Sequence, residues 1–309
     1  MTLKKILSLL PWISTFCVIL LGFLAPQQLD VWGNMIAILV IVLLGIPHGA
    51  TDHLLFKSLA KNSGRFSWIS FLAKYLFLIT IFLLLWWKIP VLAMAVFLLI
   101  SAYHFGQSQW IKLNASTTVG AVWYMLWGGY ILMAVLLLNY EETYPILKSI
   151  IGYAPMISRF WQLFLPLIYL VLICLLIREL YVSQVISKAR AIREVFVLIL
   201  LILNFLQAPL LTGFAVFFVF WHSLESFQQQ IIGLNVLHDQ SSIRQYLAHL
   251  IFFSLIAISI IAAFSLSDTA RLLSYQWIGH IFIFISVITI PHSLLMDSFL
   301  KNTANPYKA

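Results

Sequence analysis

Charged residues are scarce in this 309-residue chain. Asp, Glu, Lys and Arg together make up 9% of it, whereas 62% of the residues are hydrophobic. A water-soluble protein of this length needs more charge to cover its surface. The scarcity therefore excludes an ordinary soluble protein and predicts an all-α fold, a polytopic membrane helix bundle. With no soluble domain or long linker in the pattern, we expect residues 1–309 to form a single integral-membrane helical domain.

Cysteine and negative charge are also rare. Cys17 and Cys174 both lie in apolar runs, where a thiol acts as a small hydrophobic side chain rather than as half of a disulfide. Only 10 acidic residues oppose 18 basic ones, which gives a formal net charge of +8. The basic residues are scattered over short loops and form no patch interleaved with aromatic rings. We therefore expect no nucleic-acid partner, and assign the positive charge to membrane topology and to contact with the lipid bilayer.

Long apolar runs make up most of the chain, and a membrane-spanning helix needs about 20 such residues. By that criterion the sequence predicts about ten transmembrane helices. They are expected near residues 6–25, 32–48, 69–87, 89–107, 118–139, 160–178, 193–207, 209–224, 245–266 and 276–296. Gln207-Ala208-Pro209 predicts a tight turn between the seventh and the eighth. The segment 144–157 is apolar but short and rich in Pro and Gly, which predicts an interfacial or re-entrant piece.

The basic residues predict how these helices are oriented. If the N-terminus lies in the cytoplasm, 14 of the 18 Lys and Arg residues fall on the inner side and four on the outer side. The outer ones are Lys88, Lys148, Arg159 and Arg271. This asymmetry is typical of membrane proteins. It predicts that both termini are cytoplasmic, in a multi-pass protein of the cell (inner) membrane.

Four histidines lie at the ends of predicted spans that run from outside to inside. They are His48 in Pro47-His48-Gly49, His104 in Tyr103-His104-Phe105-Gly106, His222 in Trp221-His222-Ser223, and His292 after Pro291. The orientation therefore brings them to one depth, near the cytoplasmic leaflet. Imidazoles within a membrane are costly and mark functional sites, and neutral imidazole is a good ligand for Fe, Zn, Cu or Ni. The pattern predicts a metal site built on helices near 32–53, 89–107, 209–226 and 276–297.

The segment Gly45-Ile46-Pro47-His48-Gly49-Ala50-Thr51-Asp52-His53 carries further candidates. On a continuous helix Asp52 would lie about 40° around from His48, so its carboxylate can accept the free N–H of that imidazole or of a neighbouring one. His53 would point about 140° away. It can share the metal with His48 only where the Pro and Gly residues make the segment irregular, so the sequence leaves it open as a ligand or a residue that lines the site.

Other polar residues near the predicted site have simpler interpretations. Glu225 and Asp297 follow His222 and His292 closely enough to serve as carboxylate ligands, but a solvated charge at the inner leaflet is the expected role of each. The position of His249, near the inner end of its span, indicates a structural role. An interhelical hydrogen bond would explain any one of the four histidines, but it explains less well that all four lie at one level.

These motifs resemble those of the Brp/Blh family of bacterial and archaeal membrane β-carotene 15,15′-dioxygenases, which are associated with retinal-based rhodopsins. The resemblance rests on the PHGxxDH element at residues 47–53, on the His104 and His222 motifs and on a late Pro291-His292. It covers the membrane core from the second span to the tenth. Two positions depart from the family pattern. Ser226 stands where many members have a further histidine, and Gln109 stands where an acidic residue is expected.

The resemblance implies a reaction. It is the cleavage of β-carotene by O2 at its central double bond, at a non-haem Fe(2+) site held by histidines, to give two molecules of retinal. His48, His104 and His222 resemble iron ligands. His292 or His53 then completes the site, or three protein ligands suffice. The resemblance also implies a functional link to a microbial rhodopsin.

Two other classes of function fit parts of the sequence. One is a carotenoid- or retinal-binding or transport protein of the membrane, which needs no metal. The other is a different membrane oxidase with a histidine-bound metal that acts on an apolar substrate. A di-iron desaturase or hydroxylase is disfavoured because the chain has no HxxHH cluster. A haem carrier would need facing histidine pairs, which one histidine per helix at a single level does not provide.

Overall fold

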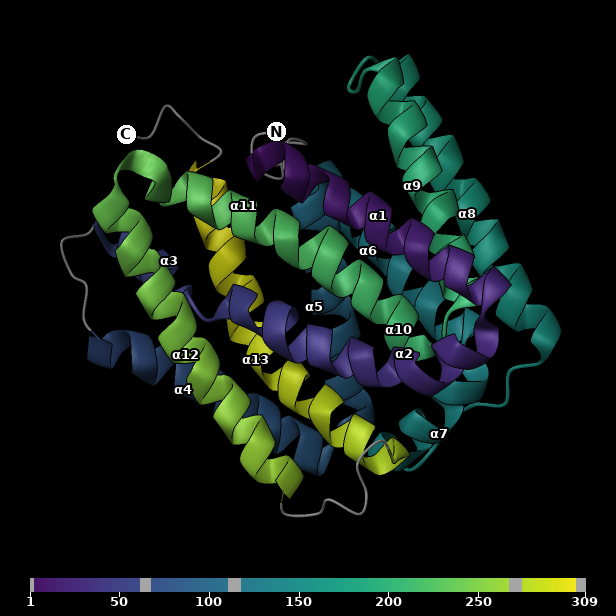
Figure 1. Cartoon of the computed structure of the whole chain (residues 1–309), viewed down its shortest axis with the longest axis horizontal. Helices are drawn as coiled ribbons and strands as arrows, with labels where there is room; N and C mark the ends of the chain where they lie inside the picture. Colours follow the sequence, from purple (N-terminus) through teal and green to yellow (C-terminus); the bar gives the residue numbers. More distant parts are fainter. Residues whose placement is uncertain (1–2, 62–67, 111–117, 267–273, 304–309) are drawn as a thin grey trace.

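A computed structural model describes residues 3–61, 68–110, 118–266 and 274–303, and every regular element in these ranges is helical (Figure 1). The elements are α1 (Leu3–Leu24), α2 (Pro26–Val40), the π-helix η1 (Ile41–Gly45), the 3-10 helix η2 (Ile46–Gly49), α3 (Asp52–Lys61), α4 (Trp68–Lys88), α5 (Pro90–Trp110), α6 (Thr118–Leu138), α7 (Tyr140–Ile151), α8 (Arg159–Val182), α9 (Lys188–Gln207), α10 (Leu210–Ala215), the π-helix η3 (Val216–Ser223), α11 (Leu224–Gly233), the 3-10 turn η4 (Val236–His238), α12 (Gln240–Leu266) and α13 (Tyr275–Thr303). The predicted all-α class is confirmed.

Eight helices of the described residues are long and apolar enough to cross a membrane. Each of them coincides with one of the predicted spans. The other two predicted spans are α1, whose apolar part Ser8–Leu24 is shorter, and α9, which begins with several charged residues. Of the basic residues used to orient the chain, Arg65, Lys112, Arg271 and Lys308 lie outside the described residues.

The outer surface of the bundle is strongly apolar, as a lipid-facing surface must be. On α4, for example, Ile69 is 80% exposed and Phe77 is 63% exposed. Exposed apolar side chains on this scale would be unfavourable in water, but they are ordinary against acyl chains. The backbone groups of these helices are hydrogen-bonded within each helix, which the bilayer requires.

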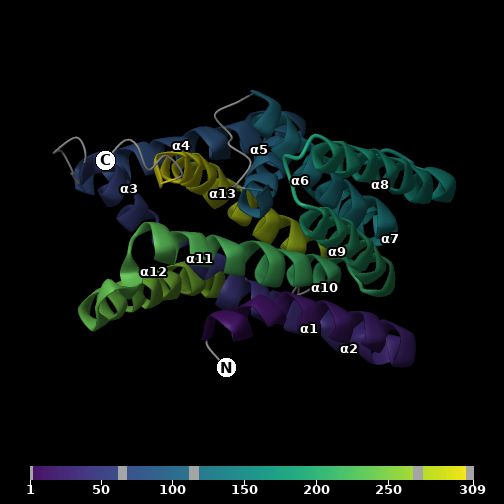
Figure 2. The same ribbon diagram turned by 90° about the horizontal axis from the view of Figure 1, so that it is seen from above.

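Two layers of helices enclose the interior. Figure 2 shows α1, α2, α10, α11 and α12 on one side and α4, α5, α6 and α8 on the other, with α13 running between them. Accordingly α13 packs against α3, α4, α5 and α7. The broken helices η2 and η3, together with α5 and α13, bring residues far apart in the sequence to the centre of the bundle.

The turn predicted at Gln207-Ala208-Pro209 is confirmed, and the short apolar segment predicted to be interfacial or re-entrant is mostly helical. The segment after Gln207 is a turn, with Ala208 extended and Pro209 preceding α10. The short apolar segment after α6 forms a separate helix, α7, which ends at Gly152 with a positive φ of 76°. A left-handed residue at this position is a common helix stop, and glycine adopts it without steric cost.

Helices α5 and α6 approach closely because each presents a glycine to the backbone of the other. A Cβ atom on Gly106 would lie 1.9 Å from the carbonyl oxygen of Tyr124, and one on Gly128 would lie 1.9 Å from that of Ala102. Small residues allow such contacts between membrane helices. This crossing fixes the part of α5 that carries His104.

We predict that Gly128→Ala destabilises the bundle by about 1–3 kcal/mol, because the added methyl group must push two backbones apart. The neighbouring Gly129→Ala is the matched control, since its Cβ would meet the Tyr169 hydroxyl at 3.4 Å and the Ala102 Cβ at 3.9 Å but no backbone atom of the described residues within 4 Å. Thermal unfolding of both variants in detergent measures the difference. Equal midpoints for the two variants would contradict the close crossing of α5 and α6.

Candidate metal centre

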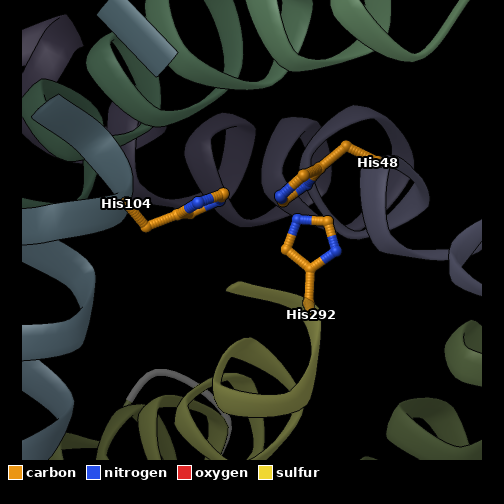
Figure 3. Close-up of side chains that lie close together, drawn as sticks. All are labelled: His48, His104 and His292. Carbon is orange, nitrogen blue, oxygen red and sulfur yellow. The ribbon is translucent and has the colours of Figure 1, made fainter. Parts of the chain in front are cut away.

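Four buried histidine rings lie together where η2, α5, η3 and α13 meet. The ring centroids are 4.7 Å apart for His48 and His292, 5.2 Å for His104 and His292, 4.8 Å for His104 and His222, and 5.4 Å for His48 and His222. Each ring therefore neighbours two others. Figure 3 shows His48, His104 and His292 directed toward a common space, and one nitrogen from each of these three lies within 4.8 Å of the others.

Irregular helical segments position two of the four rings. His48 lies in the 3-10 turn η2, directly after the π-helix η1, and His222 lies in the π-helix η3. π-Helical turns are rare and occur often at functional sites. Gly45 belongs to this irregular segment, and a Cβ there would lie 2.7 Å from the Phe218 ring. Glycine therefore allows the two broken helices to pack against each other beside the histidines.

Hydrogen bonds fix which nitrogen of His48 and His292 carries the proton. The Nδ1 atom of His48 is bonded to the carbonyl oxygen of Gly45, which can only accept, so Nδ1 donates. The Nδ1 atom of His292 lies 2.7 Å from Oδ1 of the buried Asp52 carboxylate and donates to it. Both rings then keep the lone pair on Nε2, which is the atom that a metal ion would use.

The same logic applies to His222. Its Nδ1 atom lies 2.9 Å from the hydroxyl of Ser108, and that hydroxyl donates its own hydrogen to the carbonyl of Phe105. The hydroxyl therefore accepts from Nδ1–H, and the Nε2 lone pair of His222 is again left bare. In the part of the chain that the structure describes, neither nitrogen of His104 has a hydrogen-bond partner.

The bare nitrogens are buried. His104, His222 and His292 are each 2% exposed, and their Nε2 atoms have no hydrogen-bond partner among the described residues. An unpaired buried polar atom costs about 1–3 kcal/mol, so several in one place require an explanation. A metal ion bound by His48, His104 and His292, whose nitrogens lie within 4.8 Å of one another, would accept such lone pairs. The ring of His222 adjoins those of His104 and His48 but does not belong to this group of three. The donor set, neutral imidazole nitrogens oriented by partners on the opposite side of the ring, fits such an ion.

Asp52 joins three helices at the site. Its carboxylate accepts from His292 of α13 and, at 2.9 Å, from the Tyr75 hydroxyl of α4, while Asp52 itself begins α3. Of the two partners that the sequence left open, the structure places Asp52 on a neighbouring imidazole rather than on His48. Gln230 holds the same segment from the other side, since its amide donates to the carbonyl of His48 at 2.9 Å.

The remaining candidates lie outside the ring cluster. His53 points away from it and bonds at 3.0 Å to His249, with Trp68 and Phe253 packed against its ring. Asp297 accepts hydrogen bonds from Tyr103 and Gln107 and pairs with Lys301, and Glu225 contacts Gln229. Ser226 is completely buried and its hydroxyl has no partner among the described residues. Gln109 donates to Glu194 of α9.

Sequence reasoning did not find Tyr75 and Ser108. Ser108 follows His104 by one helical turn, so its presence on the same face of α5 was a usable signal. Tyr75 gave no such signal, because its contact with Asp52 depends on how α4 packs against α3.

An apolar cavity lies beside the histidines. It is lined by α2, η1, η2, α5, α6, α7, α10 and α13 and contains about 1120 Å³ of empty space, part of it open to the surroundings. Thr143 is the single polar residue in its lining, and its hydroxyl is bonded to the carbonyl of Leu136. Phe105 lines the cavity and also contacts the His222 ring at 4.6 Å. The cavity therefore suits an apolar ligand, and Phe105 connects its lining to the histidine cluster.

Comparison with known proteins agrees on one family. The family model for β-carotene 15,15′-dioxygenase matches residues 39–300. A curated β-carotene 15,15′-dioxygenase from an uncultured marine bacterium, 66A03, is 28% identical over 269 residues, which cover 86% of this chain and 93% of that protein. No solved structure matches the chain.

We predict that Asp52→Asn lowers the metal affinity about 10- to 100-fold, because an amide no longer fixes the tautomer of His292 by charge. Glu225→Gln is the matched control, since that carboxylate lies beside η3 and contacts Gln229 rather than a histidine. Competition with a coloured chelator on the purified variants measures the affinity. A normal affinity in Asp52→Asn would show that the carboxylate has no part in the site.

Proposed function

The chain belongs to the β-carotene 15,15′-dioxygenase family, and from this premise we propose that it cleaves β-carotene at the central double bond with O2 to give two molecules of retinal. The observation that carries the proposal is the group of buried histidines with bare Nε2 atoms beside an apolar cavity. A membrane-embedded site suits a substrate that stays in the bilayer.

We propose that His48, His104, His222 and His292 hold one iron(II) ion. Imidazole nitrogens suit several first-row metals, and the choice of iron comes from the dioxygenase chemistry of the family. The ion would supply the binding and activation of O2. His222 belongs to the set because its ring contacts those of both His104 and His48 and its Nδ1 is held by Ser108. Ser226 is buried, and its hydroxyl side chain cannot serve as a further imidazole ligand.

The reaction needs little acid–base chemistry from the protein. The C=C bond breaks, each of its carbons gains one oxygen atom of the same O2 molecule, and no proton or external electron is consumed. The residues around the site then have two tasks. Asp52, Ser108 and the Gly45 carbonyl hold the imidazoles in one tautomer, and the apolar rings of Phe105 and Phe218 keep water away from the place where the polyene must lie.

The setting of the protein follows from the same proposal. We propose that it is a single helical domain of the cell (inner) membrane with both termini in the cytoplasm, and that the histidines lie toward the cytoplasmic leaflet. β-Carotene reaches it from the lipid bilayer and retinal leaves by the same medium. We propose a microbial rhodopsin as the recipient of the product, since retinal is its chromophore.

We predict that His104→Ala lowers both bound iron and retinal formation at least about tenfold, because a buried ligand position is lost. His280→Ala is the control, since that residue is exposed and lies near the other end of α13. The test uses bacteria that make β-carotene, with retinal measured by chromatography and iron measured on the purified protein. Wild-type protein in the membrane without any retinal would rule out the proposed reaction.

A further inference from the structure

The lining of the apolar cavity comes from two levels of the bundle. At the level of the histidines it includes Phe105, which directly follows His104, and Ile46, two residues before His48. At the other level the lining is formed by residues of the short helix α7 and by the first turn of α13. These residues are Thr143, Ile146, Leu147, Ile150, Trp277 and Ile278. Helix α7 therefore closes the cavity at the end opposite to the histidines.

Helix α7 is held firmly in this place. A Cβ on Gly279 of α13 would lie 2.8 Å from Ile150, so the two helices touch closely. The Ser149 hydroxyl contacts the carbonyl of Tyr275 at 3.2 Å, and the Thr143 hydroxyl is bonded to the carbonyl of Leu136 on α6. Ile146 is buried between these helices. A ligand that enters the cavity meets a fixed wall at α7.

The depth of the cavity follows from the helices that line it. On α5, Met94 lines the cavity ten residues before His104, which corresponds to about 15 Å along the helix. On α13, Ile278 precedes His292 by 14 residues, or about 21 Å. The histidines and the α7 wall are therefore separated by roughly 15 to 21 Å along these helix axes.

This depth matches one half of a symmetric C40 carotenoid. An extended chain advances about 1.2 Å per bond, the value given by the reach of an extended peptide. The bonds from the central double bond to the ionone ring then span roughly 11 Å, and the ring extends the half to about 15 Å. A whole carotenoid is twice as long and cannot fit between the histidines and α7.

We infer that the cavity takes one half of the substrate, ring first, and that α7 stops the ring where the central double bond lies beside the metal. The inference rests on the function proposed above. It makes the wall formed by α7, and Ile146 in particular, the part of the protein that selects which bond is cut. The other half of the substrate lies outside this cavity, so only one half of the substrate determines which bond is cut.

Two variants of Ile146 test the depth of the cavity in opposite directions. Ile146→Trp makes it shallower, so the substrate stops early and the next double bond toward the ring lies beside the metal. Ile146→Ala makes it deeper and brings the next double bond away from the ring to that place. Lys148→Trp, on the exposed face of α7, is the matched control. A carotenoid with one ionone ring and an aldehyde at its other end shows the direction of a shift, which a symmetric substrate would hide.

With this substrate and the iron-loaded full chain, we expect wild type and Lys148→Trp to release retinal from the ring-bearing half. The ring-bearing product of Ile146→Trp is two carbons shorter than retinal, and that of Ile146→Ala two carbons longer. Each ratio to retinal should rise roughly tenfold or more. Retinal as the unchanged main product of both variants would overturn the inference. Absence of retinal from wild type would instead overturn the proposed function.

A binding measurement covers the case in which a variant is inactive. The iron-free proteins are purified from carotenoid-producing cells, and the retained carotenoid is measured by its absorbance. We expect Ile146→Trp to retain several-fold less carotenoid than Lys148→Trp. If the two retain equal amounts, or if lipid alone fills the cavity in wild type, α7 does not form the end of the substrate site.

Discussion

The burial of four imidazoles in an apolar bundle is the constraint on which the rest of the structure depends. Each bare ring nitrogen there would cost about 1–3 kcal/mol if nothing bound it. A metal ion bound by these nitrogens would offset this cost and would turn the separate penalties into one binding site. The helices have to position the four imidazole rings more precisely than the packing of an apolar core requires. The broken segments η1, η2 and η3 and the close crossing of α5 and α6 are the means by which they do so.

The partners of the imidazoles are as important as the rings themselves. A backbone carbonyl, a serine and a carboxylate each hold one Nδ1–H, and so they decide which nitrogen is free. Asp52 also bonds to Tyr75, which ties the site to the outer helix α4. The cavity beside the site is apolar, since its lining offers almost no polar group to a ligand. Together they place a cluster of buried histidines beside a cavity with an apolar lining.

Much of this arrangement could be predicted from the sequence. Hydrophobic runs reveal membrane helices because the bilayer has a fixed thickness, and Lys and Arg reveal their direction. Those two signals bring the four histidines together. The hydrogen-bond partners could not be predicted, because they depend on the rotation and tilt of neighbouring helices. His53 illustrates the limit, since its partner His249 lies 196 residues away. The π-helical turns and the role of α7 as a wall also depend on packing that no local pattern encodes.

The central claim is that four histidines bind a single iron ion. X-ray absorption at the iron edge of the purified, iron-loaded protein tests it most directly, because imidazole rings give a characteristic multiple-scattering pattern that can be counted. The account predicts one iron per chain with four imidazole nitrogens in its first shell and no sulfur. A shell dominated by carboxylate oxygen, or one with three imidazoles or fewer, would contradict it.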